Sequence, residues 1–179
     1  MGLHRDGTTY GMSPVEIHVR RLIWYQISYL DIRTCEAQGP RPGIHEGDFD
    51  TKFPLNVDDN DLESTSPPTE DAQHWTDMTL TLIRFEANEM MRTLWVDRPR
   101  LEKKQVSLTT VLGKIENFRR MLYAKYGPVL DTTEPIHQVA SLVMSILCNR
   151  MMIMVLHRYH NGVVARIPGI GHDNLLTRR

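Results

Sequence analysis

The sequence predicts an all-α protein, an irregular bundle of about four long helices joined by a long acidic Pro/Ser-rich connection. Four stretches carry apolar residues at three- and four-residue steps, and no stretch alternates convincingly with period two. Proline and glycine residues mark the ends of these stretches. The 179 residues, 41% hydrophobic and 24% charged, fit one globular domain.

The first helix is predicted to begin at Ser13, because Ser13-Pro14-x-Glu16 matches a capping box with proline at the first helical position. It continues to about Ala37, and Gly39-Pro40 forbids continuation. Its apolar face comprises Val15, Val19, Leu22, Ile23, Ile27 and Leu30, widened by Trp24, Tyr25 and Tyr29. A face this wide predicts packing partners on more than one side.

Residues 39–74 change to Pro, Gly, Asp, Ser and Thr and form the long connection. A segment of this length is usually functional, ordered by packing, or disordered. We expect its first half to pack on the helices through Phe49, Phe53, Leu55 and Val57. The second half is expected to be mobile.

Helical periodicity resumes at Leu80 and is predicted to stop near Pro99, whose nitrogen carries no hydrogen to donate. The next helix carries a single apolar stripe from Leu108 to Leu122 and ends before Gly127-Pro128.

The last helix is predicted to run from Pro135 to about Tyr159 and is apolar nearly all round, which is typical of the central helix of a bundle. Asn149 and Arg150 interrupt it, so we expect a buried core helix and no membrane span. No sustained heptad repeat stands out in the sequence. Residues 161–179 are Gly-rich and unpatterned, and we expect a poorly ordered tail.

An acidic run inside the connection is the strongest candidate for chemistry, because Mg²⁺ prefers carboxylate oxygens and bridges to phosphates. It contains Asp58, Asp59, Asp61 and Glu63. One alternative is therefore a truncated all-helical Mg²⁺-dependent protein similar to terpene cyclases, using Asp58, Asp59 and Asp61. The metal motifs of that class fail here, since Leu62 and Pro68 occupy positions that need acidic ligands. We interpret the run as a solvated loop and assign no catalytic, cofactor-binding or metal-binding residue.

Other candidates are weaker. His157 and His160 are one helical turn apart, and His172 with Asp173 could complete a metal site only if the tail folded back. Cys35 and Cys148, the only cysteines, lie in apolar helical patterns where thiols are usually inert.

Seven methionines at helical spacing are interpreted as core, with a small apolar effector or a partner helix as the alternative: Met90, Met91, Met121, Met144, Met151, Met152 and Met154. A formal charge of −1 gives no overall basic field for nucleic acid.

Residues Leu3 to Leu62 carry a specific series of short motifs. In order they are His4-Arg5-Asp6-Gly7, the Ser13 cap, Arg20-Arg21-x-x-Trp24, Asp31-x-Arg33, Phe49-Asp50-Thr51, Pro54-Leu55-Asn56 and Asp58-Asp59-x-Asp61-Leu62. This series resembles the central homology region of fungal Zn(II)2Cys6 binuclear-cluster transcription factors. Later pieces, at residues 75–86 and 123–140, fit with less force.

The resemblance implies a non-enzymatic, all-α regulatory segment, residues 1–160, of a nuclear regulator of transcription by RNA polymerase II. In that family zinc and DNA are bound by a six-cysteine cluster, which this chain lacks, so we expect no cofactor here and DNA contact only through that absent cluster. Co-regulators or a small effector are the implied partners. Relative to the family domain the segment is incomplete. Exposed faces on the Ser13 and Val139 helices, with self-association, are therefore expected.

Overall fold

The computed structural model describes residues 2–39 and 41–164, with side chains at all of these positions except 38 and 158–164. The described chain is helical, without a strand. Its elements are η1 (Gly7–Tyr10), α1 (Pro14–Gln38), α2 (Asp59–Leu62), α3 (Thr79–Glu102), α4 (Leu108–Tyr126), η2 (Gly127–Val129) and α5 (Pro135–Val164). The four long helices confirm the predicted all-α fold class.

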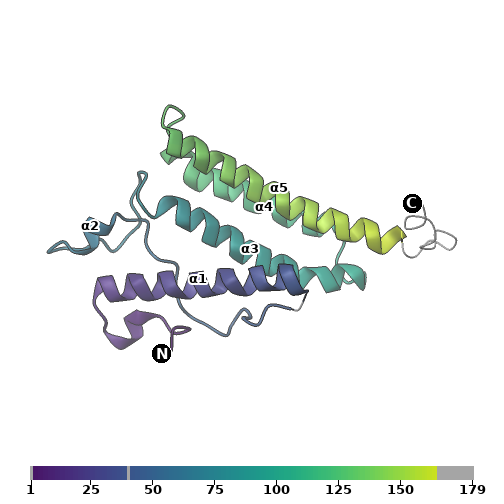
Figure 1. Cartoon of the computed structure of the whole chain (residues 1–179), viewed down its shortest axis with the longest axis horizontal. Coiled ribbons are helices and arrows are strands. Elements are labelled where there is room, and N and C mark those ends of the chain that lie inside the picture. The colour runs from purple at the N-terminus through teal and green to yellow at the C-terminus, as the bar shows by residue number, and fades with distance from the viewer. Residues whose placement is uncertain (1, 40, 165–179) are drawn as a thin grey trace, which may run out of the picture.

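Helix α3 occupies the centre of the bundle and contacts α1, α4 and α5, while α4 and α5 also contact each other. In Figure 1, α3 lies between α1 and the pair formed by α4 and α5. Helices α1, α3 and α5 run in the same direction, and α4 runs in the opposite one (Figure 1). The main core joins side chains of all four helices, among them Ile32, Ile83, Ile115 and Met144.

Helix α1 begins and ends where the sequence predicts. The Ser13 hydroxyl accepts from the Glu16 amide at 3.4 Å, and the Glu16 carboxylate accepts from the Ser13 amide at 2.9 Å, which completes the capping box. At the other end Gly39 has φ +81°, a left-handed conformation that favours glycine, and its amide donates to the Cys35 carbonyl at 2.8 Å.

The length of the connection follows from the direction of the helices. Because α1 and α3 run the same way, the chain between them must return along α1, whose 25 residues span about 37 Å. The first half of the connection packs as predicted. The ring centroids of Phe49 and Trp24 lie 5.1 Å apart, those of the stacked rings of Phe53 and Tyr25 lie 4.2 Å apart, and Val57 is buried. The second half contains the one-turn helix α2, anchored by the buried side chain of Leu62.

The sequence predicts that the second long helix stops near Pro99, and α3 runs through this proline and ends at Glu102. The proline falls in the last turn, so it removes a single donor near the end of the helix, and the Lys103 amide still donates to the Pro99 carbonyl at 3.1 Å. Ion pairs also hold this end of α3. Asp97, 2% exposed, pairs with Lys114 of α4 and, at 3.2 Å, with Arg100.

The prediction that α5 is the buried central helix is also wrong. One of its faces packs on α3 and α4 through Met144, Cys148, Met151 and Val155, but its opposite face is exposed. The helix also extends to Val164, beyond the predicted end near Tyr159. Within the described residues, Pro135–His157 is the one helix whose length and apolar composition would allow it to cross a membrane.

Candidate functional site

Two polar residues near the N-terminus, Asp6 and Arg21, form a buried ion pair. Asp6, 3% exposed, accepts from Arg21 of α1 at both oxygens, from Nε at 2.8 Å and from Nη2 at 2.9 Å. The amides of Thr8 and Lys52 donate to the same carboxylate at 3.1 and 3.0 Å. Burial acts to raise the pKa of Asp6, but the hydrogen bonds from Arg21, Lys52 and Thr8 hold it well below the usual range. Asp6 is therefore an ionised anchor that joins the N-terminal segment, α1 and the connection.

The Phe49-Asp50-Thr51 motif clamps the same N-terminal segment from the other side. Asp50 accepts from the Asp6 amide at 2.7 Å and from the Arg5 guanidinium at 3.0 Å. The Thr51 hydroxyl donates to the Leu3 carbonyl at 2.7 Å. The hydrogen bond from the Asp6 amide is the largest cause of the lowered pKa of Asp50, so this carboxylate also serves as a hydrogen-bond acceptor in the fold.

Arg92 of α3 is the second polar centre and is 5% exposed. Its guanidinium donates to Asp31 at 2.9 Å, to the Ile44 carbonyl at 2.6 Å and to the Ser28 hydroxyl at 2.6 Å, and it pairs with Glu89 at 3.3 Å. Asp31 and Ser28 belong to α1 and Ile44 to the connection, so one side chain ties three segments together. Burial opposes ionisation of Asp31, yet the hydrogen bonds from Arg92 and the backbone lower its pKa.

Asn56 plays the corresponding role at the start of α3, whose N-cap residue makes no side-chain hydrogen bond. The Oδ1 atom of Asn56 accepts from the hydroxyls of Thr76 and Thr79 at 2.8 and 2.9 Å. Its Nδ2 donates to the carbonyls of Ala72 and His74 at 3.1 and 3.3 Å. The amide side chain is therefore fully used in closing the second half of the connection against α3.

The acidic run does not gather into a site. Asp58 accepts from the Asp77 amide at 2.9 Å and lies 3.9 Å from the ring of His74, which leaves it turned towards the start of α3. The remaining carboxylates, Asp59, Asp61 and Glu63, are exposed. Across residues 2–39 and 41–164, no group of three or more His, Cys, Asp or Glu side chains could hold a metal ion. The geometry therefore gives the magnesium alternative no support.

The remaining candidate groups are dispersed. Cys35 and Cys148 are 2% and 3% exposed, and burial is the largest cause that raises the pKa of each thiol. The side chain of His160, together with His172 and Asp173, lies outside what the structure describes, so a metal site with His157 stays a hypothesis. Most of the methionines belong to the core or pack against it: Met90, Met91, Met144, Met151, Met152 and Met154, whereas Met121 is 52% exposed.

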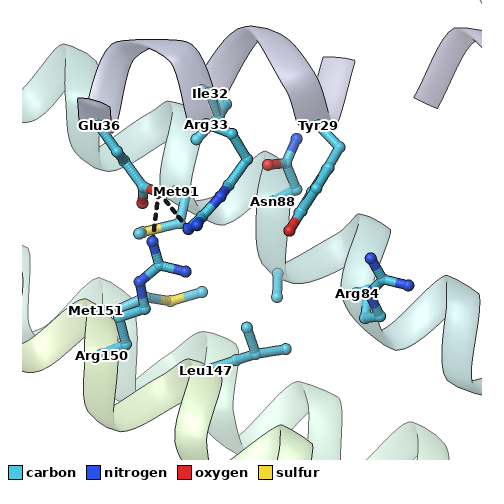
Figure 2. A pocket seen from close by; sticks show the side chains of 11 residues that line it. Tyr29, Ile32, Arg33, Glu36, Arg84, Asn88, Met91, Leu147, Arg150 and Met151 are labelled. Atoms are coloured by element: carbon cyan, nitrogen blue, oxygen red, sulfur yellow. Dashed lines mark hydrogen bonds and ion pairs between the residues drawn. The ribbon is translucent and has the colours of Figure 1, made fainter. Parts of the chain in front are cut away.

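A pocket lies between α1, α3 and α5 (Figure 2). Glu36 crosses its rim, paired with Arg33 at 2.7 Å and with Arg150 of α5. Asn88, 5% exposed, lines the pocket and its Nδ2 has no hydrogen-bond partner among the described residues. The free volume is about 30 Å³, enough for roughly one water molecule and far below the several hundred Å³ of typical ligand sites. The pocket therefore does not support an effector site.

Two exposed apolar faces are the largest unexplained feature. On α1 the face that the sequence predicts as apolar is exposed by 36–55% at Val15, Val19, Ile23, Ile27 and Leu30. On α5 the exposed side chains are Ile136, Val139, Leu142, Ile146, Ile153 and Leu156. This confirms the expected exposure on the Ser13 and Val139 helices. Of the predicted apolar face of α1, Trp24 and Tyr25 are buried, and the buried side of the helix also carries Ile32, Cys35, Arg21 and Ser28.

Comparison with known proteins gives relatives of one kind. The C6 finger domain transcription factor hasF of Aspergillus fumigatus is 35% identical over 109 residues, 58% of this chain and 14% of that protein. Pyriculol/pyriculariol biosynthesis cluster transcription factor 1 of Pyricularia oryzae is 29% identical over 169 residues, 84% of this chain and 22% of that protein. The aurofusarin cluster transcription factor aurR2 of Gibberella zeae is 28% identical over 169 residues, 89% of this chain and 24% of that protein.

The chain thus spans 14–24% of the length of these relatives. No family model and no solved structure matches it. Its two cysteines cannot supply the six that the zinc cluster uses. These comparisons confirm the resemblance drawn from the sequence: over most of its length the chain is similar to fungal C6 zinc-cluster transcription factors, in a segment that lacks the zinc cluster itself.

Proposed function

We propose that this chain is the regulatory, non-enzymatic part of a fungal sequence-specific transcription regulator, acting in the nucleus on transcription by RNA polymerase II. The observation that carries the proposal is the similarity over 84% and 89% of the chain to two fungal transcription factors. These residues do not contact DNA in our proposal. Zinc and DNA are bound by a six-cysteine cluster in another part of the regulator, and this part of the chain holds no cofactor.

The chemistry of the described residues supports a role in control. The buried polar groups are used for holding the fold: Asp6 with Arg21, Arg92 with Asp31, and Asn56 with the start of α3. The two thiols are buried, and burial raises the pKa of each. What the helices offer to a partner is apolar surface on α1 and α5. Transcriptional co-regulators that bind through apolar contacts are the partners that this surface suits.

The test is a reporter experiment in a fungal host. The chain is inserted between a DNA-binding domain that carries its own six-cysteine cluster and a strong activation domain, and reporter output is compared with the same fusion lacking the chain. Under the proposal the inserted chain restrains activation, so we expect lower output. Asp6→Asn, which breaks the buried ion pair, should lose the effect. The matched exposed variant Asp48→Asn should keep it.

Two results would count against the proposal. One is reporter output that is the same with and without the inserted chain at equal fusion abundance. The other is retardation of DNA in a gel by the chain alone at physiological salt, because that would assign DNA contact to a segment with a formal charge of −1.

A further inference from the structure

The sequence contains two Ser-Pro pairs, Ser13-Pro14 and Ser66-Pro67, and no Thr-Pro pair. A serine followed by proline is the pattern that proline-directed protein kinases select. Their cleft holds the substrate in an extended form and accepts, after the serine, a residue that has no N–H to donate. The two serines differ in their structural surroundings, and the difference decides which of them such a kinase can reach.

Ser13 is committed to the start of α1. Its hydroxyl donates to the Glu16 carboxylate at 2.8 Å and accepts from the Glu16 amide at 3.4 Å. Pro14 is already the first residue of the helix. A kinase that binds the residues around Ser13 in an extended form must unwind the first turn of α1 and break the capping box. The fold therefore protects this serine.

Ser66 lies in a part of the connection that is open to an enzyme. Residues 63–66 form a turn and bends and are exposed. Within the described chain, no side chain of residues 59–70 makes a hydrogen bond. Pro67 is half-buried and restricts Ser66 to an extended backbone, which is the form that a kinase cleft binds. Lifting Ser66 into such a cleft therefore breaks no side-chain hydrogen bond, and no helix follows it before α3.

The residues around Ser66 select the class of kinase, because kinase clefts are complementary in charge to the residues that they recognise. Arginine-directed kinases need a basic residue shortly before the serine, and no Lys or Arg lies between Lys52 and Arg84. Acid-directed kinases need a carboxylate three residues after the hydroxyl group, and that position is Thr69 for Ser66. The other hydroxyl residues of this loop also lack that carboxylate, and none of them precedes a proline: Ser64, Thr65 and Thr69.

We propose that Ser66 is a phosphorylation site for a proline-directed protein kinase, and that the phosphate releases α2 and the base of its loop. In the reaction the Ser66 Oγ bonds to the γ-phosphorus of ATP. The bond from that phosphorus to the oxygen that bridges it to the β-phosphorus breaks, and ADP leaves. The hydroxyl proton passes to the catalytic carboxylate of the kinase. This site goes beyond the proposed function and does not depend on it.

The phosphate enters surroundings that are already negative. It carries a charge of about −1.5 to −2 at pH 7. Each carboxylate within about 10 Å of it should favour the open loop by roughly 1.3-fold in about 0.15 M salt, so four to six of them give roughly three- to fivefold. Leu62 is the one buried side chain that holds α2 against this repulsion. Six carboxylates lie within eight residues of Ser66 along the chain: Asp58, Asp59, Asp61, Glu63, Glu70 and Asp71.

Phosphate transfer to the folded full chain tests the site. The chain is incubated with ATP and a proline-directed kinase of verified activity on a Ser-Pro peptide, and the modified residue is identified by tandem mass spectrometry. We expect one phosphate per chain, on Ser66, and none in Ser66→Ala or Pro67→Ala. The matched variant Thr65→Ala should be modified like the parent. Phosphate on Ser13, no phosphate on Ser66, or a Pro67→Ala variant modified like the parent would each overturn the site.

Hydrogen exchange followed by NMR tests the release. The Asp77 amide donates to Asp58, the N-cap residue of α2, at 2.9 Å, and the Ala72 amide donates to the Asn56 carbonyl at 2.8 Å. Both amides should exchange roughly three- to fivefold faster in the phosphorylated chain. The Gly39 amide at the end of α1 should be unchanged, and a phosphatase should restore the parent rates.

Salt separates repulsion from a steric effect of the phosphate. In about 1 M salt the screening length falls to about 3 Å, so the difference in exchange should nearly disappear. Equal exchange in the two forms at about 0.15 M salt would overturn the release of α2. A difference that persists undiminished at high salt would overturn the electrostatic cause.

Discussion

Removing the charge of Asp6 should be among the most destabilising single changes in this protein. The carboxylate is 3% exposed and accepts hydrogen bonds from both Nε and Nη2 of Arg21, which is itself 8% exposed. In Asp6→Asn one acceptor oxygen becomes a donor, and the guanidinium remains buried without its counter-charge. Removing one partner of a buried ion pair costs about 3–5 kcal/mol. That is a large share of the roughly 5–15 kcal/mol that keeps a domain folded.

Urea unfolding followed by circular dichroism at 222 nm measures the effect. With a slope of about 2 kcal/mol per molar urea, the midpoint of Asp6→Asn should fall by about 2 M. The exposed control Asp48→Asn should change the free energy of unfolding by less than about 0.5 kcal/mol. The pKa of Asp6 is depressed in the folded state, so its stabilisation is present above the ordinary carboxyl pKa of about 4 and is lost as the pH falls below it. The variant should therefore lose less stability than the parent in acid.

A double-mutant cycle with Arg21→Met shows whether the loss comes from the pair. If it does, the double variant is less destabilised than the sum of the single variants, by at least about 1 kcal/mol. The reasoning would be refuted by an Asp6→Asn midpoint close to that of the parent. It would also be refuted by additive losses in the cycle, which would mean that the two residues act separately.

Four further outcomes are expected. Burial lowers the pKa of His18, with Arg21 as a lesser cause and Asp59 in partial opposition. The neutral ring therefore stabilises the fold above the unfolded pKa of about 6.5, and this stabilisation is lost as the pH falls. In His18→Leu, the urea midpoint should fall less between pH 7 and pH 5 than it does in the parent. Lys104→Gly should stabilise by about 0.5 kcal/mol in the same assay, because Lys104 has φ +59°. Arg92→Met should cost about 3 kcal/mol and speed proteolysis of residues 41–57. Replacing Asp59 by Asn should leave the melting temperature unchanged with or without Mg²⁺.

The helix boundaries that the sequence predicts well are those with local chemical causes. The cap at Ser13 and the glycine at Gly39 act within a few residues, so their effect can be read directly from the order of residues. Pro99 misleads because its cost depends on position within the helix, and only the structure shows that it falls in a last turn held by Asp97.

The orientation of α1 and α5 could not be predicted, for two different physical reasons. Helix α5 is apolar on every side, so its periodicity does not say which face meets α3. Helix α1 buries Arg21 and Ser28, whose partners Asp6 and Arg92 lie 15 and 64 residues away. Polar residues on a helix usually indicate solvent, and only a tertiary contact of this kind reverses that rule. The sequence predicts a solvated loop for the acidic run from its missing ligand positions, whereas the structure places Asp59 and Asp61, both exposed, in the one-turn helix α2.

The contacts of Asn56 have a practical consequence for work on this protein. The backbone amide of Asn56 donates to the Asp71 carboxylate at 2.9 Å, and its backbone carbonyl accepts from the Ala72 amide at 2.8 Å. The chain between residues 56 and 71 therefore forms a loop closed at its base. Closing a loop costs only slightly more when residues are added to it. Thr65, exposed near the tip, is therefore a suitable place for an epitope tag or a fluorescent label, with the helices on either side left undisturbed.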